Sequence, residues 1–140
     1  LMPIYNPFEQ TLTQYLEEFI EANFWKINFG AKLELYQDEE NSSGRQFQTT
    51  IGRIDLLAID EHKKDFVIIE LKKGRSSDVV VGQILRYMGW VKENLAKNEY
   101  NVRGIVIVRE KDDKLQYALS QIQNIELFLY SISFDLRKNK

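Results

Sequence analysis

The feature that most constrains the fold is a pair of adjacent apolar segments joined by a short polar one. Residues 51–60 read IGRIDLLAID, residues 65–74 read DFVIIELKKG, and the residues between them, 61–64, are all polar. Aliphatic and β-branched residues on both sides of so short a linker predict a β-hairpin. Strands this apolar require a sheet that other parts of the chain cover.

The register of this hairpin brings charged side chains together. A four-residue turn places Asp55 opposite Glu70 and Arg53 opposite Lys72. Side chains alternate between the faces of a strand, so these four share one face, at the end far from the turn. The other face is wholly apolar and carries Ile54, Leu56, Ala58, Val67, Ile69 and Leu71.

The facing pair Asp55 and Glu70 needs a positive partner or a shared proton. Directly opposed side chains on a sheet lie about 5 Å apart, and like charges placed there destabilise it. A hard divalent ion such as Mg²⁺, bound by carboxylates and water, meets this need. The alternative is a patch of salt bridges with Arg53 and Lys72 on a solvated sheet face.

The remaining segments alternate between helical and strand patterns. Helices are predicted over residues 9–23, 78–97 and 112–122, and strands over 32–37, 47–50, 102–110 and 125–134. In the first helix, Leu12, Leu16, Phe19 and Ile20 recur at helical spacing. This order predicts one α/β domain over residues 1–140, a central mixed sheet flanked by helices. Because position 1 is Leu, the chain is also compatible with a fragment of a longer protein.

Composition excludes several classes of site. The chain has no cysteine and a single histidine, His62, which leaves oxygen ligands for any metal. Its net charge is −2, so nucleic-acid binding requires a local basic patch. No apolar run approaches the ~20 residues that span a bilayer, and no signal peptide precedes the domain. We therefore expect a cytoplasmic protein that does not enter membranes.

The helix over 78–97 carries polar residues beside its apolar stripe. Ser76, Ser77 and Asp78 offer N-cap oxygens for it. The predicted core stripe consists of Val80, Ile84, Tyr87, Met88, Val91 and Leu95. Gln83, Arg86 and Trp90 share one flank, from which they could reach the charged end of the sheet. The alternatives are a glutamine at the core rim and a tryptophan that packs rather than stacks on an unpaired base.

The segments GRIDLLAID, FVIIELKKG and GQILRYMGWV together resemble the PD-(D/E)XK nuclease superfamily, most closely the C-terminal nuclease domain of NucS-type endonucleases. Asp55 stands at the acidic position of the motif, although Ile54 replaces its proline, and Glu70-Leu71-Lys72 matches Glu-x-Lys. Gln83 and Tyr87 match a Gln-x-x-x-Tyr helix, and Glu17 stands where the family's early helix carries a glutamate. The helical wheel allows only one of Glu17 and Glu18 to face the site. The resemblance implies a restriction-endonuclease-like core.

The resemblance also implies a mechanism. Asp55, Glu70 and the Leu71 carbonyl would hold Mg²⁺, with Mn²⁺ as a substitute, and Glu17 would support the site or bind a second ion. Lys72 would position water or neutralise the transition state, and Gln83 would orient Lys72 or a phosphate oxygen. The implied function is a metal-dependent DNA endonuclease of a repair or a restriction type. The alternative is a catalytically silent DNA-binding or assembly module of the same fold.

DNA is the expected partner. The residues expected to contact it are Arg53, Lys73, Arg75, Arg86, Tyr87 and Trp90. A second copy of the chain, or a further DNA-binding domain of a longer protein, is left open as an additional partner. The polar loop at residues 38–44 is either a flap over DNA or a plain loop.

Overall fold

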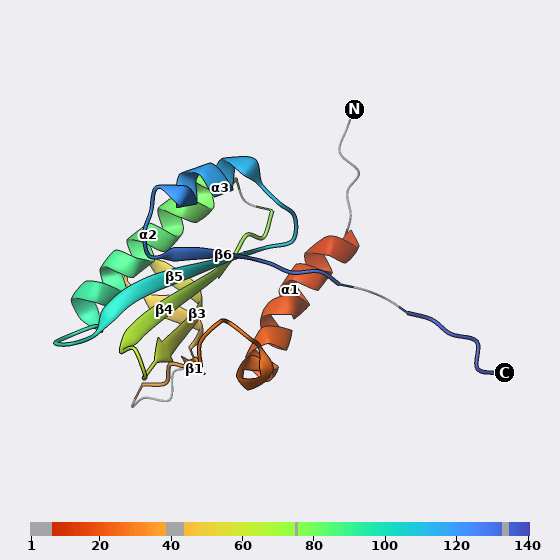
Figure 1. The fold of residues 1–140 in the computed structure, drawn as a ribbon, viewed down its shortest axis with the longest axis horizontal. Coiled ribbons are helices and arrows are strands. Elements are labelled where there is room, and N and C mark those ends of the chain that lie inside the picture. The colour runs from red at the N-terminus through yellow and green to blue at the C-terminus, as the bar shows by residue number, and fades with distance from the viewer. Residues whose placement is uncertain (1–6, 39–43, 75, 133–134) are drawn as a thin grey trace.

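The sheet has helices on both faces in the computed structural model, which describes residues 7–38, 44–74, 76–132 and 135–140 (Figure 1). Within these residues the order is α1 (Pro7–Ala22), a 3-10 turn η1 (Phe24–Lys26), β1 (Glu34–Leu35), β2 (Arg45–Thr49), β3 (Gly52–Asp60), β4 (Asp65–Leu71), α2 (Ser77–Asn94), β5 (Asn101–Val108), α3 (Asp113–Ser120) and β6 (Ile125–Leu129). The strands form one mixed sheet in the order β1-β3-β4-β5-β6, and β2 also pairs with β3. The predicted α/β fold, with a central mixed sheet flanked by helices, is confirmed.

Parallel and antiparallel pairs divide this sheet at β4. Strand β3 is antiparallel to β1, β2 and β4, whereas β4, β5 and β6 are parallel to one another. Helix α2 makes the crossover from β4 to β5, and α3 makes the crossover from β5 to β6. Parallel strands need such connections, which explains why helical and strand patterns alternate in the second half of the chain.

Two apolar cores bury the two faces of the sheet. On one face, sheet residues pack against the predicted stripe of α2 and against Leu115 and Leu119 of α3. On the other, Ile20, Phe24 and Phe29 cover a second set of sheet residues. That second set comprises Leu56, Ala58, Val67, Ile69, Leu71, Ile105 and Ile107. The wholly apolar face predicted for the hairpin is therefore the face that α1 and the segment after it cover.

Side chains cap the N-termini of α2 and α3, and the cap of α2 is at Ser76, one of the residues predicted for it. The Ser76 hydroxyl accepts a hydrogen bond from the Val79 N–H at 3.3 Å, and Asp112 accepts one from the Leu115 N–H at 3.1 Å. Both contacts satisfy N–H groups that the first turn of a helix leaves without a partner. None of the described helices is long and apolar enough to cross a membrane.

The pattern of α1 is less regular than predicted. Ile20 is buried and Leu16 packs beside it, but Phe19 is 60% exposed. The side chain of Leu12 lies outside the described residues. Two predicted strands are also shorter than expected, because β1 covers only Glu34–Leu35 and β6 ends at Leu129 where its pairing with β5 ends. The end of the predicted strand, residues 133–134, lies outside the described residues.

The predicted hairpin register is confirmed up to the charged end. Pairing runs from Asp60↔Asp65 to Leu56↔Ile69. Beyond that point β3 and β4 are no longer paired, so the predicted pairs of Asp55 with Glu70 and of Arg53 with Lys72 do not form. On its other edge β3 pairs with β2, where Arg53 lies opposite Gln48. The physical reason is that β4 ends at Leu71, so Lys72 is no longer part of a strand.

Strand β3 also loses its alternation at Asp55. Ile54, predicted to share a face with Leu56, instead belongs to the α2-side core together with Leu57, whereas Leu56 belongs to the α1-side core. Opposite this point β2 is irregular, since Gln46 has a left-handed φ of 52° between the paired residues of the ladder. This distortion changes the direction of Asp55 relative to a regular strand.

A buried ion cluster fixes the turn end of the hairpin. Asp60, 1% exposed, accepts hydrogen bonds from the Lys63 N–H at 3.0 Å and from Arg103 at 3.1 Å. Arg103 also contacts Asp65 and Glu126. Burial raises the pKa of Asp60, but the Lys63 N–H and the Arg103 charge outweigh it, so the pKa lies below its ordinary value of 3.8.

We expect Asp60→Asn to lower the free energy of unfolding at pH 7 by about 2 kcal/mol, since it removes the charge that Arg103 binds. A lowered carboxyl pKa stabilises the fold above about pH 4 and loses that effect as pH falls through the folded pKa. Denaturant unfolding from pH 7 to pH 3 should therefore show the two proteins converging in acid. Asp135→Asn, at an exposed pair with Arg137, is the control and should change little. A difference that is constant with pH would contradict this assignment.

Candidate active site

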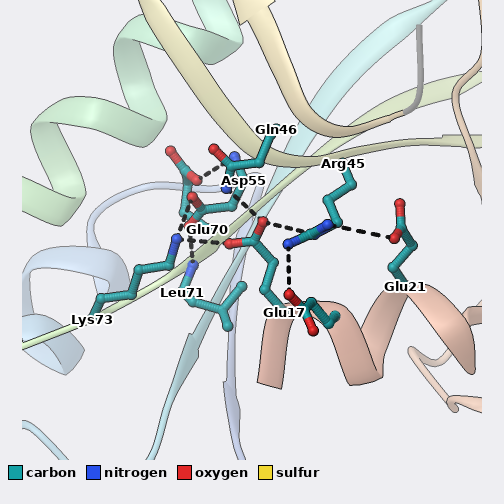
Figure 2. Close-up of polar contacts among 9 residues, drawn as sticks. Glu17, Glu21, Arg45, Gln46, Asp55, Glu70, Leu71 and Lys73 are labelled. Carbon is teal, nitrogen blue, oxygen red and sulfur yellow. Dashed lines mark hydrogen bonds and ion pairs between the residues drawn. The ribbon is translucent and has the colours of Figure 1, made fainter. Parts of the chain in front are cut away.

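Three acidic side chains come together where β4 separates from β3. Glu17 of α1, Asp55 of β3 and Glu70 of β4 are 3%, 5% and 1% exposed. Figure 2 shows them pointing toward one another, with Lys73 and residues of β2 around them. The structure thus gathers the three acidic residues that the sequence singled out, and it selects Glu17 over the exposed Glu18.

Asp55 and Glu70 are held by backbone amides. Glu70 Oε2 accepts the Asp55 N–H at 3.0 Å, and Asp55 Oδ2 accepts the Leu71 N–H at 2.9 Å. Hydrogen bonds to an ionised carboxylate are stronger than neutral ones. The repulsion expected from two facing carboxylates is therefore offset by this exchange of hydrogen bonds at the end of the β3–β4 ladder.

The cation among the carboxylates is Lys73, which the sequence had assigned to DNA contact. Its Nζ lies 2.7 Å from Glu17 Oε2 and 2.9 Å from Asp55 Oδ1. Burial lowers the pKa of Lys73, but the hydrogen bond to Glu17 and the charge of Asp55 outweigh it and raise the pKa above its ordinary value. Lys73 is therefore charged at neutral pH.

Strand β2 supplies further contacts to Glu17. Arg45 Nε lies 3.2 Å from Glu17 Oε1, and the Gln46 amide donates to the same oxygen. The guanidinium of Arg45 also lies 3.6 Å from Glu18 and 3.8 Å from Glu21. Sequence reasoning missed Gln46, because its role depends on a left-handed backbone that no local pattern indicates.

Lys72, the lysine of the Glu-x-Lys signature, makes its ion pair elsewhere. Its Nζ lies 3.5 Å from Asp112 Oδ2, which also accepts the Ser77 hydroxyl at 2.7 Å. The pKa of Asp112 is lowered by the Leu115 N–H, then by Ser77 and by the charge of Lys72. Adjacent side chains of an extended chain point to opposite sides, so Lys72 and Lys73 diverge. Asp112 was missed both as a partner and as an N-cap, because the helix predicted over residues 112–122 included it as its first residue.

The residues of α2 that were predicted to be at the site differ in their exposure to solvent. Gln83 is half-buried and Arg86 is exposed, its guanidinium beside Gly82. Tyr87, expected at DNA, is in the α2-side core. Gly52 has a φ of 139°, and a Cβ built there would meet the Tyr87 hydroxyl at 2.5 Å, so only glycine fits beside this tyrosine.

The other residues expected at DNA are spread out. Trp90 donates its indole N–H to the Thr50 hydroxyl at 2.8 Å and packs edge-on against Phe47, which favours the packing interpretation. Arg53 is exposed and donates to the Gln48 side chain at 3.0 Å. Arg75 and residues 39–43 of the proposed flap lie outside the described residues.

The carboxylates of Glu17, Asp55 and Glu70 and the Leu71 carbonyl are a donor set of the kind that binds a hard cation. Their present positions, however, do not form the coordination shell of a metal ion. Carboxylate and carbonyl oxygens are the ligands that Mg²⁺ prefers. Among the described residues, no three acidic or histidine side chains surround one point as a metal requires. The Leu71 carbonyl, the predicted backbone ligand, accepts the Lys73 N–H at 3.0 Å. A cation therefore fits this donor set only after local rearrangement.

A surface hollow lies at the other end of β4. Asp65, Arg103 and Lys92 line it together with residues of β5 and α2. Asp65 begins the strand that carries Glu70 near its end, and Arg103 already binds three carboxylates there. This hollow is thus separate from the Glu17, Asp55 and Glu70 cluster, and Asp65 is the one acid among the described residues that line it.

Comparison with known proteins gives consistent matches. The sequence profile described as "Endonuclease NucS C-terminal domain" matches residues 31–137. A repair endonuclease from Pyrococcus abyssi is 21% identical, with a TM-score of 0.60 over 93% of this chain and 49% of that chain. The protein in the structure of an EndoMS–dsDNA2 complex is 20% identical, with a TM-score of 0.64 over 88% of this chain and 46% of that chain.

These matches differ in what they cover. The profile includes Asp55, Glu70 and Lys72 but begins after α1, so Glu17 is outside it. The structural matches reach most of the chain and share the fold, and this chain spans about half the length of each of those proteins. Because the profile matches well over half of the sequence, the chain belongs to the family of the endonuclease NucS C-terminal domain.

Proposed function

We propose that this chain is a divalent-cation-dependent DNA endonuclease domain that hydrolyses phosphodiester bonds. The observation that carries the proposal is the meeting of Glu17, Asp55 and Glu70 from three elements, in a chain of the NucS C-terminal family. One structural neighbour was solved as a complex with double-stranded DNA. Buried carboxylates at the open end of a sheet have a functional rather than a stabilising rationale.

Asp55, Glu70 and the Leu71 carbonyl would hold Mg²⁺ or Mn²⁺, with Glu17 supporting the site. When bound, such an ion neutralises charge on a phosphate and lowers the pKa of a coordinated water. The protein's own part is to hold the carboxylates in a fixed orientation. The N–H groups of Asp55 and Leu71 do this by fixing one oxygen of each facing acid.

Charged side chains around the cluster would hold the DNA. Lys72 is only partly exposed, and its pair with Asp112 keeps an ammonium on the side of the sheet that Glu70 shares. Arg53 and Arg86 are exposed and offer contacts to phosphates. Such contacts give affinity without reading sequence.

A second candidate is a catalytically silent DNA-binding or assembly module of the same fold. The contacts of Lys73 and Arg45 with Glu17 and Asp55 favour it, because these cations already compensate the acidic cluster. Cleavage, as opposed to binding alone, separates the two candidates.

Cleavage of supercoiled plasmid, single-stranded, flap and mismatched DNA tests the proposal directly. We expect cleavage with Mg²⁺ or Mn²⁺ that EDTA abolishes. Glu70→Gln should reduce the rate by roughly a hundredfold or more, because a neutral amide is a poor ligand for a hard cation. Asp135→Asn is the matched control at an exposed site and should cleave like the parent. Binding without cleavage on every substrate would leave the silent module as the function, and EDTA-resistant cleavage would contradict the metal.

Stability without metal tests how Asp55 is held. Two carboxylates in simple repulsion would make Asp55→Asn neutral or stabilising. The observed contacts with Lys73 and the Leu71 N–H instead predict a loss of about 1–2 kcal/mol in the free energy of unfolding. Denaturant unfolding in EDTA measures it. A variant as stable as the parent would show that these contacts contribute no net stability.

Salt dependence tests the proposed phosphate contacts. Arg86→Ala should weaken binding to all DNA sequences alike and reduce the slope of log K against log salt by about one. Fluorescence anisotropy at several salt concentrations measures both. Arg137→Ala, at the exposed pair near the C-terminus, is the control. An unchanged slope in Arg86→Ala would remove this arginine from the interface.

A further inference from the structure

We propose that Lys73 is the resident counterion of the acidic cluster and that a divalent cation binds there only by displacing its ammonium. The inference rests on the proposed function, because it concerns the same carboxylates. It assigns to Lys73 a role that neither the Glu-x-Lys signature nor the expected contact with DNA gives it.

The position of the ammonium carries the inference. Lys73 Nζ lies within 2.9 Å of two carboxylate oxygens that come from different elements, Glu17 Oε2 and Asp55 Oδ1. The other oxygens of these side chains face the protein, Glu17 Oε1 toward Arg45 and Gln46 and Asp55 Oδ2 toward the Leu71 N–H. The oxygens that a cation could bridge are therefore the ones that Lys73 already bridges. Figure 2 shows the lysine reaching between the two acids.

Lys73 has the freedom to leave this position. It follows β4 in the connection to α2, its side chain is 31% exposed, and Gly74 after it has a φ of 75°. The backbone before it is anchored, since the Lys72 N–H binds the Ile107 carbonyl at 3.0 Å. A long ammonium side chain on a fixed backbone can exchange a buried pair for water by side-chain rotation alone. Release of the lysine is thus one part of the local rearrangement that a cation requires at this donor set.

Lys72 provides the contrast within the same loop. It carries the same charge one residue earlier, but it pairs with Asp112 and not with Glu17 or Asp55. Removal of either lysine changes the local net charge equally. Only removal of Lys73 vacates the space between the two acids. The two lysines are thus a matched pair that separates displacement from a general effect of charge.

Metal titration of the purified chain, followed by thermal unfolding, tests the inference without any assay of cleavage. In Lys73→Met we expect a lower melting temperature without metal and a half-maximal concentration of Mn²⁺ or Mg²⁺ about tenfold lower than in the parent. If Lys73 occupies the site in about nine of ten metal-free molecules, only about one in ten is ready to bind metal, and the apparent affinity of the parent is about tenfold lower. Lys72→Met should leave the half-maximal concentration within about twofold of the parent, since its ammonium does not occupy the site.

A second measurement uses the unmodified protein and does not depend on how the variants fold. The rate of acylation of each lysine is followed by mass spectrometry with and without saturating Mn²⁺. We expect the Lys73 amine to become several-fold more reactive with metal, because displacement releases it to solvent, while Lys72 is unchanged.

The outcomes are distinguishable. Equal gains in metal affinity for both variants, or unchanged reactivity of Lys73 with metal bound, would overturn displacement and leave the metal site standing. Unchanged or weaker affinity in Lys73→Met would do the same. Absence of metal binding in the parent and in both variants would overturn this inference together with the metal dependence of the proposed function.

Discussion

The separation of β3 from β4 after Leu56↔Ile69 is the constraint on which the rest of the site depends. In a regular sheet the Leu71 N–H would pair with β3, and the Asp55 N–H would pair with β2, as the Leu57 N–H does with the Gly44 carbonyl. Because the strands part, these two donors bind the carboxylates of Glu70 and Asp55 instead. Burial of an ionised carboxylate costs several kcal/mol, so fixed donors of this kind are what make the cluster compatible with folding.

Packing on the α1 face then determines where the third carboxylate lies. Glu17 is one turn before Ile20, and Ile20 and Phe24 are buried against the sheet. Residues three to four apart lie on the same face of a helix, so the apolar contact that docks α1 also aims Glu17 at Asp55. The position of Glu17 therefore depends on the apolar packing of Ile20 and Phe24 against the sheet. Loss of that packing would displace the Glu17 carboxylate without changing any residue of the acidic cluster.

The sequence could predict what is local and periodic. The hairpin register as far as Leu56, the Ser76 cap and the stripe of α2 depend on turn length, capping chemistry and helical spacing, and all three are observed. It could not predict that the pairing of β3 with β4 stops before Asp55 or that β3 is distorted there, because the distortion lies opposite the irregular backbone of β2, which is earlier in the chain. The same distortion moves Ile54 to the other core, and the divergence of Lys72 and Lys73 follows from where the strand ends.

If the cluster binds a divalent ion as proposed, it has two ways to balance its charge, and they exclude each other. Without a divalent ion, Lys73 and Arg45 from the chain itself neutralise Glu17 and Asp55. With one, the ion must supply the charge that Lys73 gives up. Because the Lys73 contact must break when the ion binds, the free energy of that contact reduces the free energy of metal binding by the same amount. A stronger lysine contact therefore makes a more stable protein and a weaker metal site. Lys73 is partly exposed, which is a compromise between fold stability and metal affinity. A fully buried pair of Lys73 with Glu17 would stabilise the fold but would prevent a cation from binding.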